Sequence, residues 1–263
     1  MQQQMELSSL PKAKESIEDQ YQELLIRLEA YRRELESEAE INYQEMVDYY
    51  TLWAHQIKTP IAAMKLLNQS DQIDRRAMEA ELFKTEQYVE MVLSYLRAGN
   101  LSSDLVLQRY FLDEIAKKAI RKYSSLFILK KIELEFHPSK VEVLTDERWA
   151  VFVVEQILSN ALKYTKKGKI IVQIKGDSII VRDTGIGISR EDLPRVMEKG
   201  FTGYNGRQDR KSTGIGLYLC KKIMKKLGHL IEIESEVGKG TTVILNFCLL
   251  YTSPSPRDST SSR

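Results

Sequence analysis

The stretch that decides the fold is QILSNALKYTKKGKIIVQIKGDSIIVRDTGIG, residues 156–187. It opens with a helical pattern of apolar residues that ends near Tyr164. Two runs rich in isoleucine and valine follow at 169–175 and 178–183, and the second ends on an aspartate before a glycine-rich turn. A buried helix followed by two adjoining strands predicts a layered α+β fold, with a polar turn at the end of the second strand.

The sequence on both sides of this stretch also shows the pattern of short strands and helices. Further strands are expected at 132–136, 230–235 and 241–247, and helices at 112–129, 146–164 and 216–227. The prediction for residues 111–249 is an α/β sandwich, in which helices cover one face of a mixed sheet.

Residues 16–100 have a different pattern, that of two long amphipathic helices. From Ile17 to Leu35 apolar residues recur at alternating spacings of four and three, and the pattern resumes from Met46 to Met64. A second helix is expected to start near Ser70 or Asp71, both good N-caps, and to end at 98–100. Two such helices bury too little surface alone, so the prediction is a helical hairpin that dimerises into a four-helix bundle.

Composition excludes several classes of protein. The 39 Lys plus Arg nearly balance the 37 Asp plus Glu, so no overall basic field favours nucleic acid. The two cysteines, Cys220 and Cys248, lack metal-binding spacing, and we expect a reducing compartment and no structural metal. No run approaches the roughly 20 apolar residues of a membrane helix, so the chain as given is expected to be cytoplasmic, with any membrane segment upstream of Met1.

Four short motifs follow one another in the second half of the chain: 160–164 (NALKY), 183–187 (DTGIG), 214–217 (GIGL) and 238–241 (GKGT). The Asn160 amide oxygen suits Mg²⁺, and Lys163 on the same helix face can reach phosphate. The Asp183 carboxylate can accept a hydrogen bond from an adenine amino group, while glycines let backbone amides approach a ligand. The GxxxxGK[ST] pattern and a GxGxxG after a strand are both absent, which argues against the two commonest nucleotide folds.

With these motifs in this order, residues 113–249 resemble the GHKL superfamily, the ATP-binding fold shared by histidine kinases, DNA gyrase B, MutL and the heat-shock chaperones of that superfamily. The resemblance implies that Asn160 holds Mg²⁺ and that Lys163 and Tyr164 contact phosphate or ribose. It implies that Asp183 holds adenine with Gly185 and Gly187, and that Phe201 marks a mobile lid at 199–213. The other residues implied at the ATP site are Thr213, Gly214, Gly216, Leu217 and Thr241.

One departure from the resemblance concerns Gln156, one turn before Asn160. Hydrolytic members such as gyrase B carry there a glutamate that activates water, and an amide cannot take a proton. This favours a fold that presents ATP to another nucleophile over an ATPase.

The expected nucleophile is His55 in WAHQIKTP, residues 53–60, which resembles the H-box of histidine kinases. His55 is offset by about 200° from Trp53 and Ile57, at 3.6 residues per turn, so it should point away from the buried stripe. Gln56 stands where most H-boxes have an acid; we expect it to be exposed, able to orient His55 but not to act as a base. Thr59 matches the position that assists dephosphorylation of the partner protein in this family.

The sequence HQIKTPI at 55–61 resembles that of the intramembrane-sensing kinases, which respond to bacitracin and other peptide antibiotics together with an ABC transporter. The resemblance implies a homodimeric kinase that uses ATP and Mg²⁺ to phosphorylate His55, passes the phosphoryl group to a response regulator, and also dephosphorylates it. The parent protein would be anchored in the bacterial cell membrane upstream of Met1. Two alternatives remain: a non-catalytic signalling scaffold that binds nucleotide, and an ATP-driven clamp like MutL, which both Gln156 and the H-box oppose.

The predicted domain organisation has five parts. They are a linker (1–15), the dimerisation and phosphotransfer hairpin (16–100), an interdomain linker (101–110), the catalytic ATP-binding domain (111–249) and a tail (250–263). The tail is rich in Ser, Pro and Thr with almost nothing to bury, so we expect it to be disordered, and it resembles translated cloning sequence.

Overall fold

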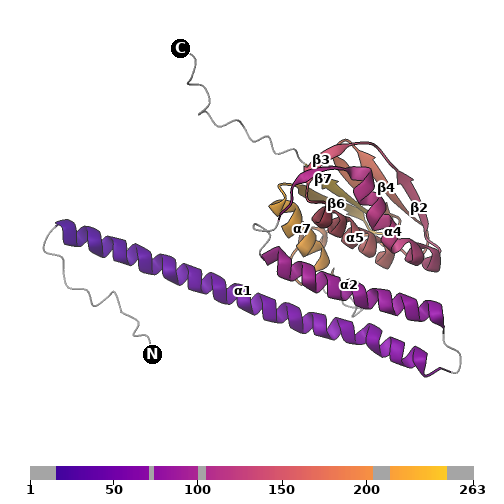
Figure 1. Ribbon diagram of the computed structural model, residues 1–263, viewed down its shortest axis with the longest axis horizontal. Coiled ribbons are helices and arrows are strands. Elements are labelled where there is room, and N and C mark those ends of the chain that lie inside the picture. Colours follow the sequence, from indigo (N-terminus) through magenta and orange to yellow (C-terminus); the bar gives the residue numbers. More distant parts are fainter. Residues whose placement is uncertain (1–15, 71–73, 100–104, 204–213, 248–263) are drawn as a thin grey trace, which may run out of the picture. The chain divides into compact units, whose positions relative to one another are not determined.

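The computed structural model describes residues 16–70, 74–99, 105–203 and 214–247 (Figure 1). The chain divides into two compact units, Met1–His55 and Gln56–Arg263. The predicted linker at 1–15 and tail at 250–263 lie outside the described residues.

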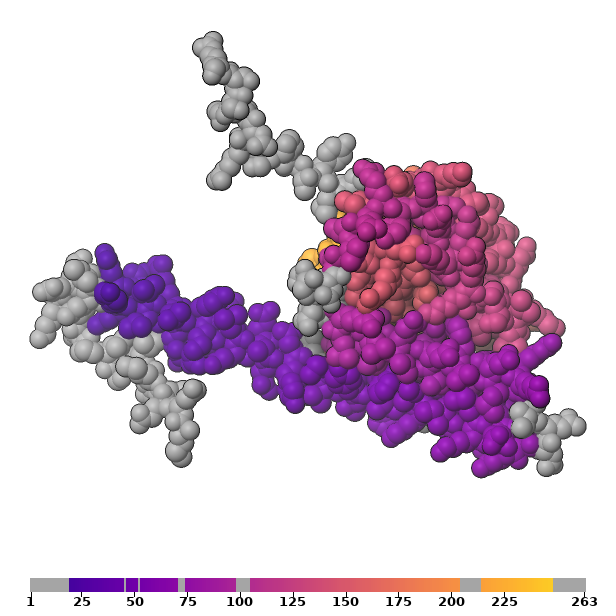
Figure 2. Space-filling view, viewed as in Figure 1, coloured from indigo at the N-terminus to yellow at the C-terminus, as the bar shows by residue number. Residues whose placement is uncertain are grey.

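Helix α1 (Ser16–Asn68) is one continuous helix that includes Pro60, as predicted. In the first unit, whose helical part is drawn in indigo in Figure 2, the residues of the apolar stripe are exposed. The side chains of this stripe are between 47% and 65% exposed: Tyr21, Leu24, Leu28, Tyr31 and Leu35. Ion pairs between neighbouring turns, such as Arg27 with Glu23, support the polar faces.

Helix α2 (Arg75–Gly99) returns along the second-unit part of α1 to form the predicted hairpin (Figure 1). Its predicted start near Ser70 is wrong, and Asp71 lies outside the described residues. The N-cap is Asp74, whose Oδ1 accepts hydrogen bonds from the backbone N–H groups of Arg76 (3.0 Å) and Ala77 (3.1 Å).

The main sheet has five strands in the order β2-β4-β5-β7-β6. They are β2 (Glu133–His137), β4 (Lys169–Lys175), β5 (Ser178–Asp183), β7 (Gly240–Asn246) and β6 (Leu230–Glu236). Only the β2–β4 pair is parallel, so the sheet is mixed, as predicted. The antiparallel order places the end of β5 beside the start of β7, and this brings Asp183 close to Thr241.

A second, two-stranded sheet was not predicted. It pairs β1 (Gln108–Phe111) with β3 (Glu142–Thr145) in antiparallel register. Each strand has only four residues, too few to show a clear alternation of apolar and polar side chains. Its first strand lies partly in the predicted linker and connects directly to α4.

Three helices cover one face of the main sheet: α4 (Leu112–Lys130), α5 (Glu147–Tyr164) and α7 (Gly216–Lys226) (Figure 1). α5 starts at Asp146, whose Oδ1 accepts from the backbone N–H of Trp149 at 3.1 Å. Because α5 packs against both α4 and α7, even the polar side chains of Glu155 and Gln156 are buried. The helix thus holds its cavity-facing residues in a rigid setting.

Candidate functional site

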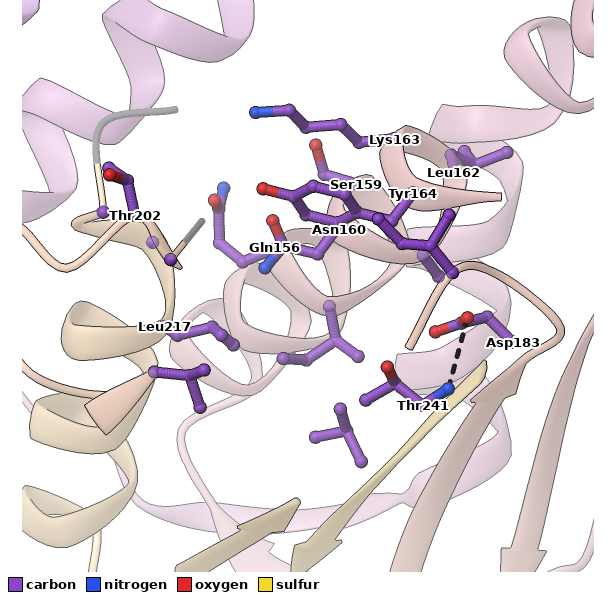
Figure 3. Close-up of a pocket in the computed structure, with 18 of the residues that line it drawn as sticks. Gln156, Ser159, Asn160, Leu162, Lys163, Tyr164, Asp183, Thr202, Leu217 and Thr241 are labelled. Atoms are coloured by element: carbon purple, nitrogen blue, oxygen red, sulfur yellow. Dashed lines mark hydrogen bonds between the residues drawn. The ribbon is translucent and has the colours of Figure 1, made fainter. Parts of the chain in front are cut away.

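A cavity of about 1020 Å³ lies in the second unit, between α5, the end of β5, the start of β7 and the start of α7 (Figure 3). Ten of the predicted nucleotide-site residues line it. They are Asn160, Lys163, Tyr164, Asp183, Gly187, Phe201, Gly214, Gly216, Leu217 and Thr241. Gly185 does not line it but binds Asp183, and Thr213 lies outside the described residues.

Helix α5 supplies the polar wall of the cavity. Gln156, Asn160 and Lys163 follow one another at spacings of four and three, so they share one face of the helix and lie together in Figure 3. The Lys163 ammonium group lies 5.2 Å from the centre of the Tyr164 ring, a cation–π contact. The amide of Asn160, the ammonium group of Lys163 and the phenol of Tyr164 thus lie along the same side of the cavity.

Asp183 forms the opposite end of the cavity. Its Oδ1 accepts two backbone hydrogen bonds, one from Gly185 N at 2.8 Å and one from Thr241 N at 3.3 Å. Figure 3 shows the second of them. Burial raises the pKa of the Asp183 carboxyl, and the two N–H donors oppose that rise. Among the described residues no hydrogen bond engages Oδ2, so one oxygen fixes the side chain while the other can accept from a ligand.

The glycines of the motifs serve the packing of the backbone itself. A Cβ on Gly187 (φ +70°) would lie 2.1 Å from the carbonyl oxygen of Glu236. A Cβ on Gly214 (φ +65°) would lie 2.5 Å from the carbonyl carbon of Gly200. These glycines therefore allow two backbone segments of the chain to pack closely together, and this packing shapes the wall of the cavity.

Gly216 differs from the other two, because a Cβ there would meet the side chain of Gln156, whose Oε1 would lie at 3.3 Å. Gln156 is 5% exposed and lines the cavity. The Gln156 side chain of α5 therefore lies beside the start of α7.

The first residues of the predicted lid, 199–213, lie against the residue that directly follows the lid. The backbone N–H of Gly200 donates to the carbonyl oxygen of Gly214 at 3.1 Å. Phe201, which lines the cavity, packs under Arg195, with 4.6 Å between the guanidinium carbon and the ring centre. The greater part of the predicted lid, 204–213, lies outside the described residues.

The H-box contributes to the same cavity. Gln56 and Thr59 line it with Pro60. The expectation that Gln56 is exposed is wrong: it is 8% exposed, and its Oε1 accepts a hydrogen bond from the Tyr88 hydroxyl at 3.3 Å. His55 belongs to the first unit and is exposed, as its offset from Trp53 and Ile57 predicted.

Sequence reasoning missed Tyr88 as a site residue because its position on the apolar stripe of α2 assigned it to the core. It lines the cavity as well, and burial raises the pKa of its hydroxyl, as does the Glu81 carboxylate. No pattern along α2 distinguishes such a residue from a packing residue.

An ion-pair bridge joins α2 to α4 and α5. The Lys122 ammonium group on α4 donates to Glu155 of α5 at 2.6 Å and also to Glu90 of α2. Burial raises the pKa of the Glu155 carboxyl, and Lys122 opposes that rise. Next to this bridge the Tyr123 hydroxyl donates to Gln87 of α2 at 2.7 Å.

The residues that the structure describes contain neither a metal-binding cluster nor a membrane-spanning helix. In residues 16–70, 74–99, 105–203 and 214–247, no group of three or more His, Cys, Asp or Glu side chains is placed to hold a metal ion. Among the helices of these same segments, none is both long and apolar enough to cross a membrane.

Comparison with known proteins supports the resemblance to the ATP-binding domain of histidine kinases. Residues 145–250 match the family described as histidine kinase-, DNA gyrase B- and HSP90-like ATPase. The chain is 30% identical over 251 residues to the sensor protein BceS of Halalkalibacterium halodurans, covering 92% of this chain and 75% of that protein. It is 32% identical over 231 residues to the sensor histidine kinase YxdK of Bacillus subtilis, covering 85% and 70%.

A solved structure shares the fold. Histidine kinase ThkA in complex with the response regulator protein TrrA superposes with a TM-score of 0.53 at 18% identity, over 82% of this chain and 66% of that one. The hairpin and the α/β sandwich predicted from the sequence are confirmed. Given the cavity between the glycine motifs, the ATPase family match and the identity to BceS and YxdK, this chain belongs to the sensor histidine kinases and carries their ATP-binding domain.

Proposed function

We propose that the chain binds Mg-ATP in this cavity, phosphorylates His55, and passes the phosphoryl group to an aspartate of a response regulator. The observation that carries the proposal is that one cavity is lined both by Asp183 and the Asn160 edge of α5 and by the H-box residues Gln56 and Thr59. The residues proposed to bind nucleotide and residues of the phosphorylation motif therefore line the same cavity.

The Asp183 end fits adenine. Its Oδ1 is occupied by backbone donors, so Oδ2 accepts from the exocyclic amino group of the base. Apolar side chains that line the same cavity can pack against a planar ring, among them Leu162, Ile186, Leu217 and Val243. Guanine carries a carbonyl oxygen where adenine has the amino group, so Asp183 would repel it.

The opposite end fits the triphosphate. Lys163 supplies positive charge, and the start of α7 at Gly216 supplies helix N-terminal amides. The amide oxygen of Asn160 is a hard ligand that would hold Mg²⁺ with phosphate oxygens. The chemistry that Mg²⁺ supplies when bound is neutralisation of the charge that develops on the phosphates.

The transfer itself needs a nucleophile and a place for its proton. A lone pair on a ring nitrogen of His55 forms the N–P bond as the bond from the γ-phosphorus to the bridging oxygen of ADP breaks, and the proton on the other ring nitrogen passes to a base or to water. His55 is exposed, as attack on a bound nucleotide requires. Gln156 cannot activate water, which suppresses hydrolysis of ATP in place of transfer.

The remaining parts of the proposal concern partners. ThkA was solved with a response regulator, and we propose such a protein as the acceptor here, with Thr59 assisting its dephosphorylation. The exposed stripe of α1 supports a homodimer through a four-helix bundle. Because residues 55–61 resemble those of the intramembrane-sensing kinases, we propose that the parent protein is anchored in the bacterial cell membrane and works with an ABC transporter.

Incubation with γ-labelled ATP and Mg²⁺ tests the function. The wild-type chain should acquire an acid-labile, base-stable phosphate, and His55→Gln should lose it while ATP affinity is kept. His137→Gln is the matched control, because His137 lies on β2 with a side chain 59% exposed and should leave labelling intact. Continued labelling of His55→Gln would refute His55 as the nucleophile, and release of inorganic phosphate without labelling would point to the clamp alternative.

A further inference from the structure

Ser235, near the end of β6, lies between the two chain segments that orient Asp183. One of these segments is the glycine-rich turn after β5, and the other is the start of β7. Each segment supplies one backbone donor to Asp183 Oδ1: Gly185 N from the first and Thr241 N from the second. The orientation of the carboxylate therefore depends on how the two segments lie against each other.

The Ser235 hydroxyl makes three hydrogen bonds at this junction. Its oxygen accepts from the backbone N–H of Ile188, in the turn after β5, at 2.8 Å. Its proton is donated to the carbonyl oxygen of Gly240, the first residue of β7, at 2.9 Å. The third bond joins Ser235 to Thr241 Oγ1 at 3.0 Å, between cross-strand partners of β6 and β7. One small side chain thus ties the turn after β5 to the start of β7.

The direction of the third bond follows from the inventory of a hydroxyl group, which has one proton and two lone pairs. Because the Ser235 proton is donated to Gly240, the Thr241 hydroxyl is the donor in the bond between the two side chains. With its proton held by Ser235, Thr241 Oγ1 acts toward a ligand as an acceptor. Thr241 and Asp183 lie side by side in Figure 3 and both line the cavity, so two acceptors meet at this end of it.

Glycines keep the same junction close. A Cβ on Gly240 (φ +109°) would lie 2.0 Å from the carbonyl oxygen of Asp183. A Cβ on Gly187 would lie 2.1 Å from the carbonyl oxygen of Glu236, the residue after Ser235. The segments therefore meet backbone to backbone, at a separation that a serine side chain can bridge. Ser235 itself is not part of the cavity lining, so its effect on a ligand passes through the residues that it holds.

We propose that Ser235 is a positioning residue for recognition of the adenine amino group, and that it acts through Asp183 and Thr241. The inference rests on the proposed function, in which Asp183 Oδ2 accepts from that amino group. An amino group carries two protons and is therefore matched by neighbouring acceptors. Without the Ser235 hydroxyl, the turn after β5 loses its tie to β7, and the Thr241 hydroxyl can turn its proton toward the ligand. Both changes weaken recognition of the amino group.

The test compares two nucleotides on the whole chain: ADP, and the diphosphate of purine riboside, which has hydrogen in place of the amino group. The ratio of their Kd values, from calorimetric titration, measures recognition of that group. Ser235→Ala should narrow the ratio by about 2- to 10-fold, the range given by one lost hydrogen bond. Ser235→Thr keeps a hydroxyl at the same position and should keep the wild-type ratio.

The ratio also separates positioning from a merely structural role. A general loosening of the domain would weaken the binding of both nucleotides by the same factor and leave the ratio unchanged. Ser178→Ala is the matched control, because at the start of β5 its Oγ donates to Asn246 at 2.6 Å, and this variant should keep the wild-type ratio. If Ser235→Ala does not fold, Ser235→Cys takes its place, since a thiol forms only weak hydrogen bonds and should narrow the ratio in the same direction.

A second measurement examines the route through Asp183. In an Asp183→Asn background the main acceptor of the amino group is already lost. The further exchange Ser235→Ala should therefore narrow the ratio less than it does in the wild-type chain, because two residues that act on one contact are not additive.

Each outcome has a distinct meaning. An unchanged ratio in Ser235→Ala, the same narrowing in Ser178→Ala or Ser235→Thr, or the same narrowing in the Asp183→Asn background would overturn the positioning role while the adenine site stands. A wild-type chain that binds both nucleotides equally would instead overturn the adenine end of the proposed function, and the role of Ser235 with it.

Discussion

Asp183 and Thr241 are joined by a hydrogen bond from the backbone N–H of Thr241 to Asp183 Oδ1, at 3.3 Å, between the end of β5 and the start of β7. The same oxygen accepts from Gly185 at 2.8 Å. The side chain is therefore oriented by the fold before any ligand arrives, and substitutions that keep one oxygen but change the other test its role cleanly.

Asp183→Asn should weaken ATP binding by about 10- to 150-fold, which corresponds to roughly 1.5–3 kcal/mol for a hydrogen bond to a charged group. The amide oxygen can still accept from Gly185 and Thr241, while the amide nitrogen would face the adenine amino group, donor against donor. Fluorescence titration with ATP measures the change. Asp177→Asn, in the exposed turn between β4 and β5, should leave affinity unchanged. Equal affinity in Asp183→Asn would remove Asp183 from the adenine site.

The pH dependence of binding follows from the same carboxyl. Because burial raises its pKa above the ordinary 3.8, it takes up a proton at a higher pH than an exposed aspartate does. Affinity for ADP should therefore be complete well above the raised pKa and be lost as the pH falls through it. The wild-type to Asp183→Asn ratio of Kd values, measured by calorimetry from pH 8 downward, cancels the protonation of the nucleotide itself. A ratio that does not change with pH would contradict this assignment.

Gly187→Ala should destabilise the catalytic domain far more than Gly176→Ala. Both glycines have positive φ, +70° and +55°, so both substitutions pay a conformational strain of about 1–2 kcal/mol. Only at Gly187 would the new Cβ also meet backbone, the Glu236 oxygen at 2.1 Å, whereas nothing lies within 4 Å at Gly176. The clash should add about 1–3 kcal/mol, visible in urea unfolding. Similar midpoints for the two variants would mean that the loop shifts freely.

Gln56→Glu should accelerate autophosphorylation without a change in ATP affinity, because a carboxylate can accept the imidazole proton that an amide cannot. General-base help is worth about 10²–10⁴-fold, and we expect the low end because water can also accept that proton. At a side chain only 8% exposed, burial should also raise the pKa of the new carboxyl, so the gain should be larger at pH 8 than at pH 6. Single-turnover rates decide it, with Gln173→Glu on β4 as the control. A rate equal to that of the wild type would show that the proton leaves by another route.

Elements with strong local patterns were predictable from the sequence. The long α1, the helices α4 and α5 and all five strands of the main sheet agree closely with the expected ranges, because their apolar residues recur with a clear period. The β1–β3 pair was missed because four-residue strands carry too few side chains to show one. The start of α2 was misplaced because Ser70 and Asp74 are both acceptable caps, and only packing chooses between them.

Site residues that belong to short contiguous motifs could be predicted from the sequence. Those whose burial depends on contact between two helices could not. Asn160, Asp183 and the glycines stand in short contiguous motifs, so their convergence could be expected from the sequence. The burial of Gln56 depends on Tyr88, 32 residues away, and no local rule relates these two positions. The H-box residues resemble an exposed helix surface until the second arm of the hairpin covers one of them.

Lys122 forms one ion pair with a buried carboxylate on α5 and another with an exposed carboxylate on α2. This difference determines which ion pair would be lost if α2 moved away from α4 and α5. Glu155, whose side chain is 8% exposed, depends on the ammonium group for compensation, whereas Glu90 is 51% exposed and returns readily to water. If α2 moves away, Lys122 stays with Glu155, and the helix that carries Asn160 keeps its charge balance. At this bridge, detachment would break a solvent-screened ion pair to Glu90, a contact that weakens with salt, and the nearby Tyr123–Gln87 hydrogen bond. Any movement of α2 away from the nucleotide-binding fold would therefore leave the buried Glu155 carboxylate paired with Lys122.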